Sequence, residues 1–130
     1  MADNGKILLM DDEQIILDVS REVFRFLGYD VSFAREGGEA IEVYKKAKAE
    51  GRGFDVVILD LTIAEGIDGR ETIKKLREFD PSVKAVVSSG YSNDPVMLNY
   101  AEYGFSGRLT KPYRINEIKI LLEEMIGGTS

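Results

Sequence analysis

The sequence Phe54-Asp55-Val56-Val57-Ile58-Leu59-Asp60 decides the fold of this chain. It is almost continuously apolar from residue 54 to residue 59, is rich in β-branched side chains, and ends abruptly at Asp60. Such a run is typical of a central strand of a parallel sheet, which is buried on both faces. We therefore expect a strand over residues 54–59, with the carboxylate of Asp60 at its carboxyl end.

Strand and helix patterns alternate on both sides of this stretch. Further strands are predicted at residues 6–10, 30–34, 84–89 and 105–110. Helices are predicted at residues 15–27, 37–50, 68–78, 92–103 and 114–126. Strict alternation of this kind gives a parallel sheet with helices on both faces and right-handed crossovers. The expected fold is a single α/β domain with a doubly wound, flavodoxin-like sheet of five strands in the order 2-1-3-4-5 and five helices.

Length and composition indicate one ordinary globular domain. The 130 residues are 44% hydrophobic and 31% charged, and no Pro- or Gly-rich linker divides them. We expect residues 1–130 to form one domain, with residues 1–5 and 127–130 as flexible ends. Because no apolar run approaches the roughly 20 residues that span a bilayer, and no secretory signal is present, we expect a cytoplasmic protein without membrane contact.

Charge and residue usage exclude several function classes. The chain has no Cys and no His, so it holds no thiol nucleophile, zinc-thiolate site or Ser-His triad, and it is not a phosphohistidine donor. The net charge of −6 argues against a dedicated nucleic-acid surface. An excess of acid makes hard cations the natural partners.

Small polar and charged residues follow four of the five predicted strands. They are Asp11 and Asp12, Asp60, Ser89 and Lys111. The carboxyl ends of parallel strands meet at one edge of the sheet, so these residues are expected to converge there. Carboxylates that lie close together repel one another unless a cation neutralises them, and Mg²⁺ prefers such oxygen ligands. The sequence therefore predicts a magnesium site in which Asp60 can act as a nucleophile towards phosphorus.

Four short motifs carry a family resemblance. They are MDDE at residues 10–13, VILDL at 57–61, SSGY at 88–91 and KPY at 111–113. In this order and spacing, the chain resembles a response-regulator receiver domain of two-component signalling over nearly its whole length. Its Ser-Ser-Gly-Tyr-Ser run is most similar to receivers attached to hybrid sensor histidine kinases.

The resemblance implies a metal site and a reaction. Asp11, Asp12, Asp60 and the backbone carbonyl of Thr62 are implied to hold Mg²⁺, for which Mn²⁺ is an expected substitute. Asp60 is implied to accept a phosphoryl group from the phosphohistidine of a sensor histidine kinase or a histidine phosphotransfer domain. Such a domain is a signalling phosphoacceptor rather than an enzyme, because it catalyses only its own phosphorylation and dephosphorylation.

The remaining landmark residues are implied to respond to the phosphoryl group. Ser89 is implied to be the switch hydroxyl, and Lys111 the partner of the phosphate, with a cis bond between Lys111 and Pro112. Phosphorylation is then expected to switch a face for a downstream partner, formed by the fourth helix, the fifth strand and the fifth helix. Pro112 and Tyr113 belong to this switch and partner region.

Two residues depart from the family pattern, and Tyr91 carries a separate expectation. Arg108 stands three residues before Lys111, where the family usually has Tyr or Phe. Tyr91, also a candidate residue of the partner face, is expected to shield the phosphoryl group from water. The residue four after the acceptor is Ala64 rather than the common Pro, and the loop that follows is expected to be mobile.

Three alternatives belong to other function classes. A haloacid-dehalogenase-like phosphatase also has a strand-end Asp nucleophile, but it needs a second Asp where this chain has Thr62. A flavodoxin-like cofactor binder needs a hydroxyl- and Gly-rich phosphate loop where this chain has repelling acids. A receiver-like interaction module that works without phosphorylation remains open.

Overall fold

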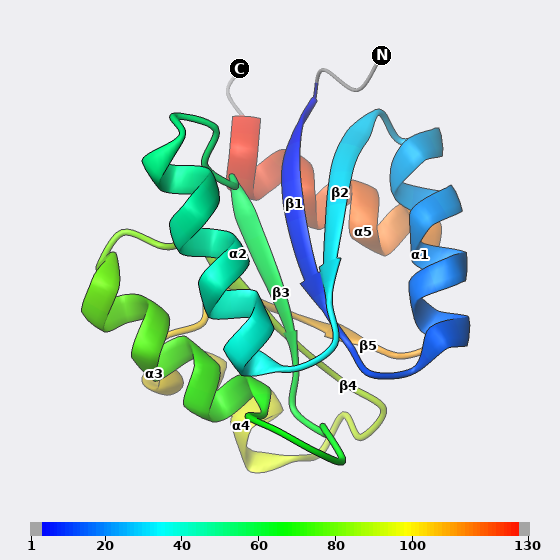
Figure 1. Cartoon of the computed structure of the whole chain (residues 1–130). Coiled ribbons are helices and arrows are strands. Elements are labelled where there is room, and N and C mark those ends of the chain that lie inside the picture. The colour runs from blue at the N-terminus through cyan, green and yellow to red at the C-terminus, as the bar shows by residue number, and fades with distance from the viewer. Residues whose placement is uncertain (1–3, 128–130) are drawn as a thin grey trace.

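In the computed structural model, which describes residues 4–127, five parallel strands pair in the order β2-β1-β3-β4-β5 (Figure 1). This order is the one that the alternating pattern predicts. The strands are β1 (Gly5–Met10), β2 (Tyr29–Ala34), β3 (Val56–Asp60), β4 (Ala85–Ser89) and β5 (Gly107–Thr110). All five residues of β3 are buried, which confirms it as the central strand.

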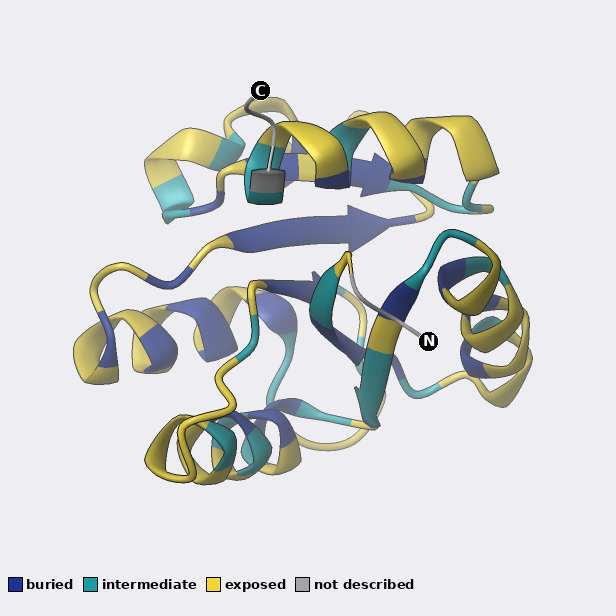
Figure 2. Cartoon of the chain, turned by 90° about the horizontal axis from the view of Figure 1, so that it is seen from above, coloured by how far each residue is buried: buried dark blue, intermediate teal, exposed yellow. Residues whose placement is uncertain are grey.

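Two layers of helices cover the sheet. The helices are α1 (Gln14–Phe26), α2 (Gly37–Ala49), α3 (Gly69–Phe79), α4 (Pro95–Leu98) and α5 (Ile115–Leu122), with a 3₁₀ turn at Tyr100–Tyr103 and a π-helical turn at Glu123–Gly127. Helices α1 and α5 pack on one face, and α2, α3 and α4 pack on the other. Figure 2 shows the central strands and the inward sides of the helices as buried, whereas β2 at the edge of the sheet is mostly intermediate.

Alternation along the strands supplies both cores. Leu8, Val57 and Val87 belong to the core under α2, α3 and α4, whereas Ile58 and Val86 belong to the core under α1 and α5. Successive side chains of a strand point to opposite faces, so each strand contributes to both layers. Full burial of each such aliphatic side chain contributes about 1.5–3 kcal/mol. This packing fixes the strand ends on which the functional residues lie.

The fourth helix is shorter than predicted. Asp94 caps its first turn, with its side chain accepting the Val96 N–H at 2.9 Å, and Pro95 is the first helical residue, as expected. The helix ends at Asn99, whose φ of −121° and ψ of 41° leave the helical region. A 3₁₀ turn follows, and Gly104 with a φ of +96° closes it. Asn competes with helical hydrogen bonding by binding nearby backbone groups, and the Asn99 amide indeed donates to the Pro95 carbonyl.

Helix α1 carries apolar side chains on two sides. Leu17 and Phe24 are buried against the sheet. Ile15, Val19 and Phe26, which share the predicted helical spacing, are exposed by 67%, 52% and 78%. Because these three positions fall on one side of a helix with 3.6 residues per turn, they form an exposed apolar stripe. We call Ile15, Val19 and Phe26 the α1 stripe.

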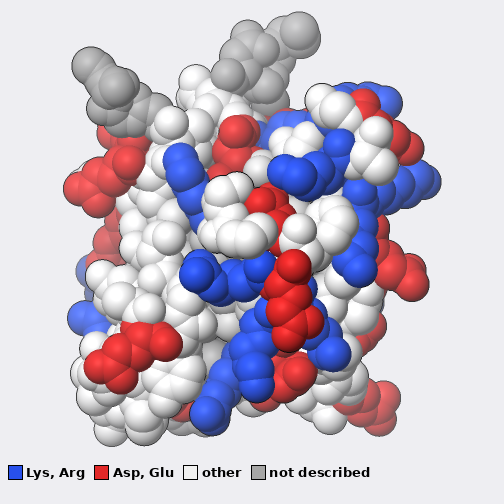
Figure 3. Space-filling view, turned by 90° about the vertical axis from the view of Figure 1, so that its left-hand side faces the viewer, with Lys and Arg blue, Asp and Glu red and all other residues white. Residues whose placement is uncertain are grey.

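The predicted flexible ends fall mostly on residues 1–3 and 128–130, which lie outside the described residues. Gly5 belongs to β1, and Gly127 belongs to the π-helical turn. Within the described part of the chain, no helix combines the length and apolar character required to cross a bilayer. On the α2 and α3 side of the molecule, basic and acidic side chains are interspersed (Figure 3).

Candidate functional site

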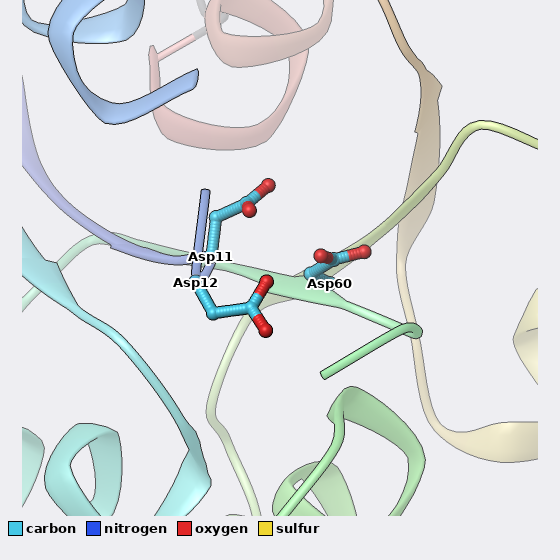
Figure 4. A group of neighbouring side chains, drawn as sticks. All are labelled: Asp11, Asp12 and Asp60. Carbon is cyan, nitrogen blue, oxygen red and sulfur yellow. The ribbon is translucent and has the colours of Figure 1, made fainter. Parts of the chain in front are cut away.

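Three acids from two strand ends converge at the carboxyl edge of the sheet. Asp11 and Asp12 follow β1, and Asp60 ends β3. One carboxylate oxygen of each lies within 4.8 Å of the others (Figure 4). Asp11 and Asp60 are almost fully buried, whereas Asp12 is half-buried. The convergence predicted from the strand ends is therefore present for all three acids.

Lys111 joins this cluster from the end of β5. Its ammonium Nζ lies 2.8 Å from Oδ2 of Asp11 and 3.1 Å from Oδ2 of Asp60. A third acid, Glu13, lies 3.5 Å from the same ammonium and is exposed. The Lys111-Pro112 peptide bond is cis, as the family resemblance implies. Residues 100 positions apart in sequence thus form one charged cluster.

The surroundings of Asp60 oppose its negative charge. Burial, and next the charge of Asp11, raise the pKa of Asp60 from 3.8 to about 6, although Lys111 and the Thr62 N–H act in the opposite direction. Burial by itself lowers the pKa of Lys111, but its hydrogen bond to Asp11 and the charges of Asp60 and Asp11 outweigh burial and raise that pKa. One ammonium thus compensates several carboxylates only in part.

The donor set fits a hard divalent cation. Three carboxylates that each place one oxygen within 4.8 Å of the others supply oxygen ligands only, which suits Mg²⁺ better than a soft metal. The partly compensated charge of the cluster gives a further reason for a cation to bind there. The residues present therefore fit the metal that the sequence predicts.

The loop after β3 closes over the acids. The Thr62 N–H donates to Oδ1 of Asp60 at 3.2 Å, and the Ala64 N–H donates to Oδ2 of Asp12 at 2.9 Å. Thr62 and Ala64 line an open cavity of about 640 Å³ together with Asp12 and Asp60. The cavity gives solvent and ligands access to the acceptor side chain.

Ser89 ends β4, and Tyr91 follows it in the next loop. Ser89 is buried at the end of β4, and its hydroxyl accepts the Tyr91 N–H at 3.0 Å. Within residues 4–127, no hydrogen bond joins Ser89 to Asp60. Tyr91 is 67% exposed and lines the cavity. The structure brings both residues to the predicted edge, but Ser89 is hydrogen-bonded to its own loop.

The remaining predicted residues occupy three places. Pro112 lines the cavity, and Tyr113 packs into the core under α1 and α5. Arg108 is exposed on β5, and its guanidinium donates to the Met97 carbonyl of α4 at 3.1 Å. The position in which the family usually has an aromatic residue is thus linked here to the end of α4 by a hydrogen bond.

Sequence reasoning missed three contributors to this site. Glu13 contacts Lys111, the Ala64 N–H contacts Asp12, and the Ser88 hydroxyl bonds the Tyr113 hydroxyl at 2.6 Å. Glu13 belongs to the acidic run that singled out Asp11 and Asp12, so its signal was present. The contact of the Ala64 N–H could not be predicted, because every residue except Pro has a backbone N–H. The contact between Ser88 and Tyr113 could not be predicted without knowledge of the strand register.

Comparisons with known proteins agree with this geometry. The model of the response regulator receiver domain family matches residues 7–123. The chain therefore belongs to the receiver domains of two-component signal transduction. These are phosphoacceptor domains, and the acid cluster, the sheet order and the Lys111 position fit that class.

Individual relatives cover very different lengths. Sporulation initiation phosphotransferase F of Bacillus subtilis is 30% identical over 116 residues, which are 89% of each chain. Transcriptional regulatory protein ZraR of Klebsiella oxytoca is 29% identical over 95% of this chain but only 26% of its own length. Sensor kinase CckA of Brucella abortus is 27% identical over 97% of this chain and 13% of its own length. The chain thus spans a minor part of several longer signalling proteins.

A solved structure shares the fold. The receiver domain of sensor histidine kinase PA1611 from Pseudomonas aeruginosa matches with a TM-score of 0.82 and 21% identity, over 96% of this chain and 98% of that domain. That structure holds a magnesium ion coordinated in its active-site cleft.

Proposed function

We propose that Asp60 accepts a phosphoryl group from the phosphohistidine of a sensor histidine kinase or a histidine phosphotransfer domain. The observation that carries the proposal is the position of the Lys111 ammonium, 2.8 Å from Asp11 and 3.1 Å from Asp60 beside an open cavity. A fixed cation next to a buried carboxylate offers a place for the charge of a transferring phosphoryl group. The chemistry is limited to phosphorylation and dephosphorylation of the domain itself.

Asp60 acts as the nucleophile in this reaction. A carboxylate oxygen of Asp60 attacks phosphorus, and the phosphorus–nitrogen bond of the donor breaks. The electron pair of that bond stays on the imidazole nitrogen, and the proton on the other ring nitrogen makes the departing imidazole neutral. Lys111 then pairs with a phosphoryl oxygen, and the Ser89 hydroxyl donates to another after leaving the Tyr91 N–H.

Asp11, Asp12, Asp60 and the Thr62 carbonyl would hold the metal ion of the reaction. When bound, Mg²⁺ supplies positive charge that neutralises the carboxylates and the phosphoryl oxygens. Mn²⁺ takes oxygen ligands in similar geometry and is the expected substitute. The N–H groups of Thr62 and Ala64 keep Asp60 and Asp12 oriented towards the cavity.

The α1 stripe is the surface that we assign to the phosphohistidine donor. Ile16, one residue after the first member of the stripe, lines the cavity beside Asp60, so a protein that reaches Asp60 lies next to α1. The three exposed apolar side chains of this helix form an apolar surface that a helix of the partner can bury. We expect Val19→Glu to slow transfer from any phosphohistidine donor that modifies the parent, while the reaction with acetyl phosphate stays unchanged.

Phosphorylation would reach a second partner through the β4 and β5 ends. The phosphoryl group adds negative charge, with which the Ser89 hydroxyl and the Lys111 ammonium can pair. Tyr91, Arg108, Pro112 and Tyr113 lie on or next to these segments, and the first three are exposed.

Acetyl phosphate tests the acceptor assignment. Incubation with Mg²⁺ and acetyl phosphate should add one phosphoryl group to the intact mass of the parent protein and none to Asp60→Asn. The matched control is Asp18→Asn, which removes an exposed acid of α1 outside the cavity lining and should leave the reaction unchanged. Equal labelling of Asp60→Asn and the parent would contradict the proposal.

A further inference from the structure

Ser88 is the immediate neighbour of Asp60 in the sheet. The register of β3 and β4 pairs Asp60 with Ser88, just as it pairs Ile58 with Val86. Ile58 and Val86 belong to the core under α1 and α5, and every second residue of a strand faces the same side. Ser88 therefore shares the face of Asp60. Its side chain is fully buried, and its hydroxyl bonds the Tyr113 hydroxyl at 2.6 Å.

This bond continues the attachment of the Lys111 segment to β4. The Lys111 N–H donates to the Ser89 carbonyl at 2.9 Å. The next residue, Pro112, has no N–H, so the backbone offers no donor there. Tyr113 provides the following attachment through its side chain, to Ser88. The segment that carries the Lys111 ammonium is thus fastened to the end of β4 at two points.

Ser88 also contacts the strand of the acceptor. Its backbone carbonyl accepts the N–H of Leu61, the residue after Asp60, at 3.0 Å. One residue therefore links the backbone next to the acceptor with the turn that holds the ammonium. A shift of Ser88 would therefore displace both the backbone next to Asp60 and the turn that carries Lys111.

Stability alone does not require two hydroxyl groups at this place. A buried hydrogen bond makes only a small net contribution to stability, and replacement of both partners by apolar groups of similar shape is often nearly neutral. A hydrogen bond differs from an apolar contact in its direction, because it fixes the distance and angle between two groups. Close control of position is valuable next to a reacting group, where small displacements slow a reaction.

We propose that Ser88 and Tyr113 are positioning residues for phosphoryl transfer, whose hydrogen bond holds the turn with Lys111 so that its ammonium stays between Asp11 and Asp60. This inference rests on the proposed role of Asp60 as the acceptor. Burial raises the pKa of the Tyr113 hydroxyl above its ordinary value, so the group keeps its proton and its hydrogen bond at neutral pH.

Four proteins test the inference: the parent, Ser88→Ala, Tyr113→Phe and the double variant. Each single variant leaves one hydroxyl without its partner and should unfold at a lower urea concentration than the parent. The double variant removes both hydroxyls and should recover most of that stability. Its rate of phosphorylation by acetyl phosphate, at fixed Mg²⁺, should nevertheless stay about tenfold below that of the parent. Hydrogen exchange of the Lys111 amide should be faster in the double variant.

Tyr44→Phe is the matched control. This substitution also removes a buried hydrogen bond, that of the Tyr44 hydroxyl to Asp80 at 2.7 Å, but Tyr44 belongs to α2 in the opposite helical layer. It should lose stability and keep the parent rate. A double variant that reacts within about twofold of the parent, or rates that follow stability across all five proteins, would overturn the inference. A parent that takes up no phosphoryl group would instead refute the role of Asp60.

Discussion

At the scale of single residues, the carboxylate of Asp60 lies in surroundings that favour its neutral form. Its pKa is raised to about 6 by burial and by Asp11, so its charge at neutral pH is unfavourable for folding in the absence of a metal ion. Asp60→Asn removes that charge and should raise the free energy of unfolding at pH 7 in a chelator by about 1–2 kcal/mol, measured by urea denaturation. The control Asp55→Asn changes an acid at the opposite end of β3. If Asp60→Asn were less stable than the parent, the attraction of Lys111 for the Asp60 carboxylate would outweigh the cost of its burial and of repulsion by Asp11.

Tyr91 belongs to the same scale. Its ring lines the cavity beside Asp60 and is free to cover a phosphoryl group. Tyr91→Ala should shorten the lifetime of phosphorylated Asp60 about two- to fivefold, because water reaches the acyl phosphate more easily. Decay of the phosphorylated mass after removal of acetyl phosphate measures this lifetime. Leu98→Ala, an exposed apolar change on α4, should leave it unaltered, and an unchanged lifetime in Tyr91→Ala would refute the shielding role.

The sequence predicted which residues meet at the site better than how they bond. Asp11, Asp60 and Lys111 were identifiable because an abrupt change from apolar to charged residues marks the end of a buried strand. The hydrogen bond of Ser88 to Tyr113 depends on strand register, which the sequence pattern leaves open. The Ser89 hydroxyl accepts a hydrogen bond from the Tyr91 N–H, a local contact that the sequence pattern does not predict, and its role towards the phosphoryl group stays a prediction.

At the scale of elements, Asp80 ties α2 to the end of α3. Its carboxylate accepts hydrogen bonds from Tyr44 at 2.7 Å, from Ser82 and from Lys48 at 3.0 Å. These bonds, that of Tyr44 foremost, hold the pKa of Asp80 well below its ordinary value of 3.8. The unfolded chain therefore binds the proton more readily, so this stabilisation is complete above about pH 4 and is lost as the pH falls towards the folded pKa. Denaturation between pH 5 and pH 2 should show a smaller loss of stability in Asp80→Asn than in the parent, and parallel curves would contradict the assignment.

The loop after Asp60 is fastened to the start of α2. One Glu36 oxygen, Oε1, accepts the N–H groups of Gly38 at 2.8 Å and Ile67 at 3.2 Å. Gly66 has a φ of +109°, and a Cβ there would lie 2.6 Å from the same oxygen. The loop that was expected to be mobile thus has anchors at Ala64 and at Ile67.

Removal of the Glu36 carboxylate tests this anchor. Glu36→Ala should lower stability by about 1 kcal/mol, as loss of a helix cap does, and should speed hydrogen exchange of the Ile67 amide. Glu42→Ala, an exposed change on the same helix, serves as the control. Unchanged hydrogen exchange at Ile67 would contradict this anchor. The hydrogen bond from the Gly37 N–H to the Ile67 carbonyl would then be sufficient to hold the loop without Glu36.

Prediction of elements succeeded where pattern and propensity agree. The five strands and four of the helices follow from apolar runs and periodicity with shifts of a few residues at their ends. The fourth helix failed beyond Leu98, because a helical apolar pattern does not reveal that Asn99 leaves the helical region. The α1 stripe shows the converse limit, since helical spacing alone does not separate side chains that pack on the sheet from those that face outward.

At the scale of the whole molecule, the fold places all its reactive groups at one edge. Every strand is parallel, so all five carboxyl ends lie together, whereas Gly5 and Ile126 meet at the opposite end. Right-handed crossovers and a fixed strand order bring Asp11, Asp60 and Lys111 together without any local contact between them in sequence. This arrangement could be predicted from the sequence because few topologies suit alternating strands and helices.

The most direct measurement locates the phosphoryl group in the chain. The protein is treated with acetyl phosphate and Mg²⁺, the acyl phosphate is reduced with borohydride, and the peptide that carries the resulting homoserine is sequenced by mass spectrometry. We expect homoserine at position 60 alone, and only when a divalent ion is present during the reaction. Homoserine at position 11 or 12, or at position 60 with equal yield in a chelator, would contradict the account.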